Sequence, residues 1–170
     1  MLGESKIHGT RGNRMAVDAT TATYQREQLT DALIEEITPL LVRHYTEIAH
    51  YQDIKLDPDW SAYFNIQANG PMRIYTARAE DHALIGYSCF FVRYNPHYSR
   101  SLQAVNDVIF IDKERRGFGR QFIAWCDGQL KAEGVQVVYH HIKFAHDWSP
   151  ILERMGYEAQ DKIMSRRLDR

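Results

Sequence analysis

The chain has 170 residues, 44% of them hydrophobic, which is enough for one domain with a sizeable core. Its 21 basic and 22 acidic residues give a formal charge of -1, and this balance excludes the general basic field that non-specific nucleic-acid binding requires. No apolar run approaches the ~20 residues that cross a bilayer. The two cysteines, Cys89 and Cys126, lie in apolar patterns and favour a reducing compartment, so a cytoplasmic protein is expected.

The amino-terminal segment differs from the rest of the chain. Residues 1–19 are polar and show no periodicity, so a disordered extension is expected there. Residues 20–170 are expected to form a single domain, and the stretch from Thr20 to Gln25 is its first candidate strand.

Two helices are predicted next. Thr30 can cap a helix whose apolar residues recur at helical spacing, and Pro39 within it indicates a kink or the start of another helix. The stretch "LDPDWSAYFNIQANG" predicts a short helix with Asp57 as its cap and Gly70 as its stop.

Strands dominate the middle of the chain. Three segments rich in β-branched and aromatic residues are separated by turn residues and predict an antiparallel meander: Met72–Ala79, Ala83–Tyr94 and Ser101–Ile111. A helix from Gly117 to Glu133 follows, then a strand in "VQVVYHHIKF", a short helix capped by Asp147 or Ser149, and a last strand pair around "YEAQDKIMSRRL". This order predicts an α/β (α+β) domain that contains a βαβ unit.

The turn inside that unit carries a candidate ligand site. The stretch "FIDKERRGFGRQF" places Arg115, Arg116 and Arg120 around Gly117 and Gly119 at the start of the predicted helix. Unpaired amides and the helix dipole make such a place suitable for phosphate, and glycines let a ligand approach the backbone. The alternative is that the glycines serve only the geometry of the turn.

The stretch "VNDVIFIDKERRGFGRQFIAWCDGQLKAEGVQVVYHHIK", followed by "ILERMGYE", resembles the GNAT superfamily of acetyl-CoA-dependent N-acetyltransferases. The coenzyme motif of that superfamily runs Q/R-x-x-G-x-G/A, and many members carry Y-x-x-x-G-F/Y later in the chain. The segments "HYQDIKLDPDW", "LIGYSCFFVR", "HYSRSLQAVNDV" and "ERMGYE" are similar to a subgroup common in tailed bacteriophages and prophages. The resemblance implies a single mixed, mostly antiparallel sheet flanked by helices, and acetyl-CoA as the cofactor.

The resemblance also assigns coenzyme-binding residues. The motif glycines correspond to Gly117 and Gly119, and the backbone amides expected to face the pyrophosphate are those of Arg115, Arg116, Phe118 and Arg120. Val108, Ile109, Phe110 and Ile111 correspond to the strand that pairs with the pantetheine arm, and His146 is a further coenzyme-binding candidate. Glu114 stands at the Q/R position, where a carboxylate repels a pyrophosphate unless Arg115 takes over.

Acetyl transfer needs a neutral amine, and Asp107 is the first candidate for its base. This carboxylate lies inside the apolar run "AVNDVIFI", where burial would raise its pKa. The alternative is an aspartate that only binds a loop amide. His140 and His141 are the other candidates for the base; as neighbours on a strand they point to opposite faces, so at most one reaches the cleft, and no metal site is expected.

The acid that protonates the leaving thiolate is less clear in the sequence. The tyrosine expected four residues before Gly156 is replaced by Leu152. Tyr139, Tyr87, Tyr94 and His146 are further candidates for this acid, and a thiol with a pKa near ~8.5 can also leave without one.

The acceptor amine is expected over the early helices. From Gln28 to Gly70 there are seven acidic and two basic residues. The aromatic residues considered for acceptor binding are Tyr45, Trp60, Tyr63 and Tyr87. Acidic and aromatic side chains suit a cationic amine, although aromatic residues at helical spacing equally serve core packing.

Two other functions stay open on the sequence. The first is a catalytically inactive GNAT-fold module that binds coenzyme A or regulates, which Glu114 and Leu152 favour. The second is a nucleotide- or nucleic-acid-binding domain, which needs a basic surface that the near-neutral composition does not indicate. A homodimer is possible in either case.

Overall fold

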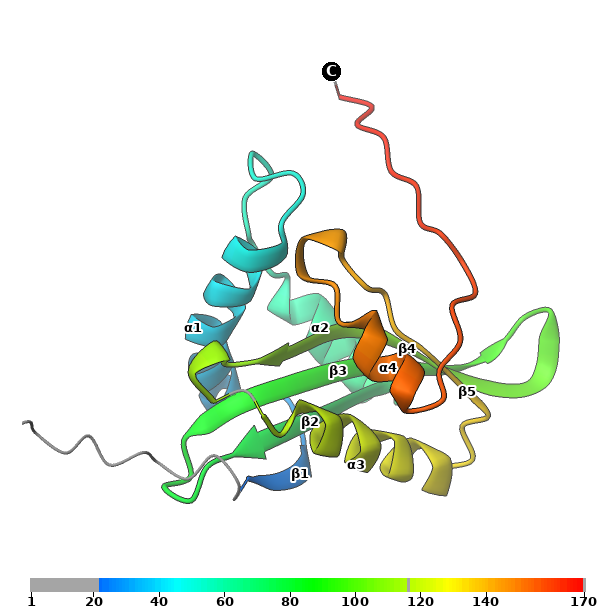
Figure 1. The fold of residues 1–170 in the computed structure, drawn as a ribbon, viewed down its shortest axis with the longest axis horizontal. Helices are drawn as coiled ribbons and strands as arrows, with labels where there is room; N and C mark the ends of the chain where they lie inside the picture. Colours follow the sequence, from blue (N-terminus) through cyan, green and yellow to red (C-terminus); the bar gives the residue numbers. More distant parts are fainter. Residues whose placement is uncertain (1–21, 116, 170) are drawn as a thin grey trace, which may run out of the picture.

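The computed structural model describes residues 22–115 and 117–169 (Figure 1). Five strands form one sheet in the order β1-β2-β3-β4-β5: β1 (Thr23–Glu27), β2 (Met72–Arg78), β3 (Leu84–Asn95), β4 (Tyr98–Ile111) and β5 (Val137–Tyr139). Neighbours from β1 to β4 are antiparallel, and β5 runs parallel to β4. The predicted fold class, a mixed and mostly antiparallel sheet with a βαβ unit, is confirmed.

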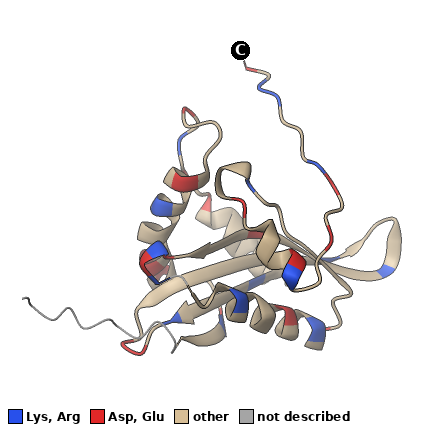
Figure 2. Ribbon diagram, in the orientation of Figure 1, with Lys and Arg blue, Asp and Glu red and all other residues tan. Residues whose placement is uncertain are grey.

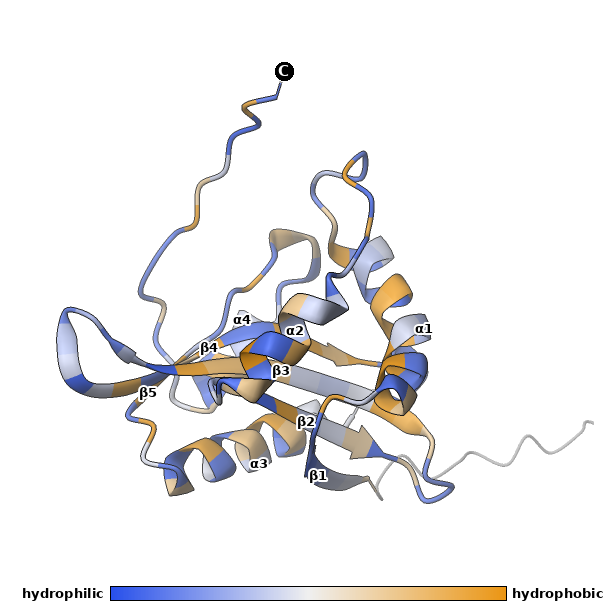
Figure 3. Ribbon diagram, turned by 180° about the vertical axis from the view of Figure 1, so that it is seen from behind, coloured by the Kyte–Doolittle hydropathy of each residue, from blue (hydrophilic) through white to orange (hydrophobic). Residues whose placement is uncertain are grey.

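Helices cover both faces of this sheet. The helices are α1 (Asp31–Ile48), α2 (Trp60–Ala68), α3 (Gly119–Ala132) and α4 (Ser149–Arg154), with short 3-10 turns η1 (Lys113–Arg115) and η2 (Phe144–His146). Hydrophobic and hydrophilic residues alternate around α1 (Figure 3). Leu33, Ile37 and Leu40 of α1 pack with Met72 and Phe110 of the sheet, so α1 closes one face.

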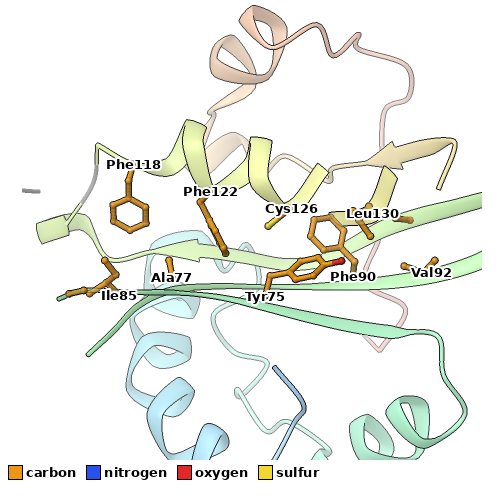
Figure 4. Packing of buried hydrophobic residues seen from close by; sticks show 11 residues of the cluster. Tyr75, Ala77, Ile85, Phe90, Val92, Phe118, Phe122, Cys126 and Leu130 are labelled. Carbon is orange, nitrogen blue, oxygen red and sulfur yellow. The ribbon is translucent and has the colours of Figure 1, made fainter. Parts of the chain in front are cut away.

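The opposite face of the sheet packs against α3 (Figure 4). Phe122 and Leu130 of α3 are fully buried against Tyr75 and Phe90 of the strands. These side chains recur at helical spacing on α3, as the sequence predicts. Because α3 is fixed along its whole length, its amino end is held at the carboxyl end of β4.

Two details of the helices differ from the sequence predictions. α1 continues through Pro39 as a single helix, so no second helix begins there. Thr30 caps α1 as expected, with its hydroxyl accepting a hydrogen bond from the Leu33 amide at 3.1 Å. The predicted cap of α2 is wrong: Asp59, rather than Asp57, accepts the Ala62 amide at 3.0 Å, because the helix begins two residues later than expected.

The carboxyl-terminal prediction is also wrong. The strand expected in "VQVVYHHIKF" shortens to the three residues of β5, and residues 157–169 form no strand. Residues 158–169, here called the C-terminal arm, run outward from the body (Figure 1). Ser165 contacts the Tyr51 hydroxyl at 3.1 Å, and Arg167 pairs with Asp53 at 2.8 Å. These contacts hold the arm beside the loop after α1 instead of beside β5.

Candidate active site

The sheet opens at a bulge in β4. Cys89 of β3 lies opposite Val108, whereas the next residue, Phe90, lies opposite Asn106. Asp107 is therefore an extra residue on β4 without a partner in β3, which is the geometry of a β-bulge. Bulges re-aim side chains and bend the strand, so the strand direction changes at Asp107.

The pairing with β5 stops just before this bulge. The register between the two strands ends at Val105 opposite Tyr139. One residue further, the Asn106 side chain, which is 4% exposed, accepts a hydrogen bond from the His141 amide at 3.3 Å. A side chain thus ends the ladder. Beyond it, residues 108–111 of β4 have no strand partner on the β5 side within the described chain.

Asp107 and Tyr63 meet at the bulge. The Tyr63 hydroxyl of α2 donates a hydrogen bond to Asp107 Oδ2 at 2.8 Å. Burial and this carboxylate raise the pKa of Tyr63, so its hydroxyl remains a donor. The expected burial of Asp107 is wrong, because the bulge turns the side chain outward and leaves it exposed.

Tyr87 lies on β3 behind the same carboxylate. Its side chain is buried, and its hydroxyl has no hydrogen-bond partner in the described chain. Burial is the main cause of its raised pKa, with smaller contributions from Tyr63 and Asp107. The structure thus brings Asp107 of β4, Tyr63 of α2 and Tyr87 of β3 close to one another.

The glycine turn links β4 to α3. Gly117 has a φ of +135°, a region that side-chain-bearing residues rarely adopt. Phe118 is the N-cap of α3 and provides no side-chain acceptor, so the amides of the first helical turn have no cap from this residue. An added Cβ on Gly119 would lie 3.0 Å from Ile111 Cδ1, so this glycine permits close contact between helix and strand.

The arginines of the turn are placed differently from one another. The Arg115 amide already donates to the Asp112 carbonyl at 2.9 Å, so it does not face outward as the family pattern implies. Arg120 is exposed on the first turn of α3. Arg116 lies outside the described residues. Glu114 is exposed on η1, and its carboxylate can turn into solvent instead of facing a bound anion.

The two candidate histidines lie just past β5, not on it as expected. His140 packs edge-on against Phe90, Trp148 and Tyr157, with ring centroids 5.6, 5.3 and 5.3 Å away. Burial lowers the pKa of His140 to about 4, with a smaller effect from His141, so His140 is neutral near pH 7. His141 is exposed. His140 Nδ1 is buried and has no partner in the described chain.

Three further candidates lie on η2, α1 and α2. His146 lies on η2 with Nδ1 3.8 Å from the Glu47 carboxylate of α1. Tyr45 donates hydrogen bonds to carbonyls of the following loop, including that of Ile54, so its hydroxyl is used in holding that loop. Trp60 packs against Tyr63 with ring centroids 5.7 Å apart.

Sequence reasoning missed Asn106, whose side chain ends the β4–β5 ladder. An amide residue next to Asp107 in an apolar strand was the available signal. Of Val108, Ile109, Phe110 and Ile111, only Phe110 is fully buried, and the others are partly buried in the two cores.

The described residues offer neither a membrane-spanning helix nor a cluster of metal ligands. None of their helices has the length and apolarity needed to cross a membrane. They also contain no group of three or more His, Cys, Asp or Glu residues placed to hold a metal ion.

Comparison with known proteins identifies the fold. No protein-family model matches the chain, and no curated protein matches it either. Solved structures do. An aminoglycoside acetyltransferase from an uncultured soil metagenomic sample, in complex with trehalose, has a TM-score of 0.68 at 14% identity over 87% of this chain and 97% of its own.

Two other structures agree with it. A predicted acetyltransferase from Clostridium acetobutylicum, solved with acetyl-CoA, has a TM-score of 0.63 at 14% identity and covers 87% of this chain and 97% of its own. A transcriptional regulator from Bacillus halodurans has a TM-score of 0.69 at 14% identity over 86% of this chain and 100% of its own. The chain has the fold of the GNAT acetyltransferases.

Proposed function

We propose that the protein is an N-acetyltransferase that moves an acetyl group from acetyl-CoA to a primary amine of a small molecule or protein. The observation that carries this proposal is the opening between β4 and β5 at the Asp107 bulge, immediately before the glycine turn. A strand with unpaired backbone next to a helix amino end suits a long ligand with an amide-containing arm and a phosphate group.

The coenzyme would lie along β4 and end at α3. The backbone of residues 108–111 offers unpaired amides and carbonyls to the pantetheine arm. The first-turn amides of α3, with the helix dipole and Arg120, face the pyrophosphate. In this arrangement the thioester reaches the bulge, next to Asp107.

The acceptor amine would approach Asp107 from the α2 side. The carboxylate attracts the ammonium form, and its proton passes to Asp107 or to water. The free amine then attacks the thioester carbonyl, so a C–N bond forms and the C–S bond breaks. As the amide forms, the nitrogen gives up its second proton to water, and the coenzyme leaves as a thiolate. The thiolate takes a proton from water, because Leu152, at 5% exposure, replaces the expected tyrosine.

A coenzyme-binding module without catalysis is the second candidate. Leu152 is buried in α4 and cannot act as an acid, and a protein of the same fold is a transcriptional regulator. This candidate predicts that acetyl-CoA binds but that no amine releases its thiol.

Calorimetry with acetyl-CoA tests both candidates together, because both require the ligand to bind. Gly117→Asp is expected to abolish saturable binding, since it combines a strained backbone with a negative charge beside the pyrophosphate. Gly128→Ala, in the exposed middle of α3, is the matched control and should bind normally. Absence of binding to the unaltered chain would reject both candidates, and thiol release with a panel of amines distinguishes the enzyme from the module.

A further inference from the structure

A polar pocket lies on the sheet beyond the bulge. Its volume is about 300 Å³, which is at the lower end of the range for small-molecule sites. The lining residues come from β3, β4, β5, the hairpin between β3 and β4, and the C-terminal arm: Arg93, Asn95, Pro96, Gln103, Val105, Tyr139 and Asp161.

The polar amides of this pocket are already used. Asn95 Nδ2 donates to Gln103 Oε1 at 2.9 Å, and Gln103 Nε2 donates to the Ser101 hydroxyl at 3.2 Å. The two charged groups are not. Within the described chain, the Arg93 guanidinium and the Asp161 carboxylate form no ion pair or hydrogen bond. The pocket therefore presents one positive and one negative group, each free for a ligand.

Such a pair fits a zwitterion. A guanidinium binds a carboxylate through two parallel hydrogen bonds, and a carboxylate binds an ammonium group. Pro96, Val105 and Tyr139 also line the pocket and offer apolar surface for methylene groups. An α-amino acid carries both charges on one carbon, whereas a simple amine carries only one.

The pocket lies at a defined distance from the bulge. Val105, the lining residue nearest the bulge, precedes Asp107 by two residues on β4, so about 7 Å of strand separates them. Arg93 lies opposite Gln103, further from the bulge, so its guanidinium has to extend along the strand toward Val105 to meet the ligand. A spacer of three or four methylenes between two functional groups covers roughly 5 to 6 Å. A ligand held by its α-carbon in the pocket can thus bring a side-chain amine to Asp107.

We infer that the acceptor is a free diamino acid, with its α-carboxylate on Arg93, its α-ammonium on Asp161 and its side-chain amine at Asp107. This inference rests on the proposed acetyl transfer and names the class of acceptor. The product would carry the acetyl group on the side-chain nitrogen, because the α-nitrogen is held away from the thioester.

A panel of related amines tests this recognition. Thiol release is compared for lysine, ornithine and 2,4-diaminobutyrate with that for three analogues of lysine. Lysinamide lacks the carboxylate charge, Nα-acetyllysine lacks the α-ammonium charge, and cadaverine lacks both groups. The kcat/KM of lysine or ornithine is expected to exceed that of each of the three analogues by at least about tenfold. This ratio corresponds to the loss of one hydrogen bond to a charged group. Equal rates for lysine and cadaverine would overturn the inference, as would acetylation of the α-nitrogen seen by mass spectrometry.

Two exposed substitutions locate the charges. Arg93→Gln should raise KM for lysine to the value for lysinamide, and Asp161→Asn should raise it to the value for Nα-acetyllysine, with kcat nearly unchanged. Lys131→Gln, on α3 across the sheet, is the control and should leave the preference intact. A preference that survives both pocket substitutions would refute these roles.

Direct binding keeps this test separate from the proposed enzyme. Calorimetry with lysine alone measures the pocket without coenzyme or turnover. Lysine binding that Arg93→Gln weakens about tenfold supports recognition of a diamino acid by the pocket even if acetyl-CoA does not bind, in which case the proposed acetyl transfer fails and only the binding site stands. If simple amines release thiol from acetyl-CoA but lysine does not bind, the inference is wrong and the proposed function is supported.

Discussion

Two half-buried histidines make stability depend on pH. Burial is the main cause that lowers the pKa of His44 and of His140 to about 4, from an ordinary value of 6.5. Between these values the unfolded chain binds protons that the folded chain does not. Stability is therefore complete above pH 6.5 and is lost as the pH falls toward 4. Urea unfolding should show a loss of about 3 kcal/mol over this interval from His140 alone.

His140→Phe tests that assignment. The new ring keeps the edge contacts with Phe90, Trp148 and Tyr157 but cannot take a proton. The variant should unfold with a flatter pH dependence than the parent between pH 6.5 and 4. Identical slopes for the two proteins would show that other groups carry the dependence.

The hydrogen bond between Tyr63 and Asp107 is expected to matter for turnover more than for folding. Both groups lie at the surface of the site, so Tyr63→Phe should shift the melting temperature little. Loss of a hydrogen bond to a charged group should lower kcat about tenfold. Tyr24→Phe, in the core on the other face, is the control, and an unchanged kcat in Tyr63→Phe would remove this positioning role.

At the scale of elements, two glycines, one in the turn before α3 and one inside α3, have opposite predicted effects. Gly128 is exposed inside the helix, and an added Cβ meets nothing within 4 Å, so Gly128→Ala should stabilise the protein by about 1 kcal/mol. Gly117→Ala should destabilise it by about 1 to 3 kcal/mol, because φ is +135° there. Denaturant midpoints measure both, and equal effects would contradict the backbone argument.

The sequence predicted elements best where one pattern was long and its packing local. The meander of β2, β3 and β4 and the amphipathic stripe of α3 repeat over many residues, and their bounds agree within a few positions. β5 was overestimated because "VQVVYHHIKF" has strand composition, whereas the length of its pairing depends on Asn106 in another strand. The sequence pattern indicates a kink or a new helix at Pro39, but α1 continues through it. Packing of α1 against the sheet outweighs the one hydrogen bond that proline cannot donate.

The site was predictable in part for the same reason. Asp107 and the glycine turn stand out because each interrupts a local pattern. The hydrogen bond from Tyr63 joins residues 44 positions apart, and the pocket brings Arg93 to Asp161 of the arm. Nothing in local periodicity encodes such long-range proximity, so those partners emerge only from the fold.

At the scale of the whole molecule, charge is mixed along the chain. Acidic and basic positions are interspersed along α1 and along the arm (Figure 2). In the part of the chain that the structure describes, the charges along these two segments are not of one sign.

Apolar side chains of the arm are exposed, and β5 is an edge strand. Ile163, Met164 and Leu168 are 65%, 88% and 87% exposed. Unpaired strand edges and exposed apolar segments favour pairing with another chain, so a homodimer stays our prediction. Light scattering should detect a dimer whose fraction rises with concentration. Deletion of residues 158–170 should leave a monomer, and a dimer that persists after this deletion would exclude the arm from the interface.

Because Asp161 lies on the C-terminal arm, loss of the arm would also remove part of the pocket. The arm carries one wall of the acceptor pocket but none of the residues proposed to hold the coenzyme. Under the proposed function, a protease that trims this tail would leave the acetyl transfer intact and erase the selectivity proposed for a diamino acid. Clipped and intact forms in one preparation would then behave as two catalysts, one promiscuous and one discriminating, from a single gene product.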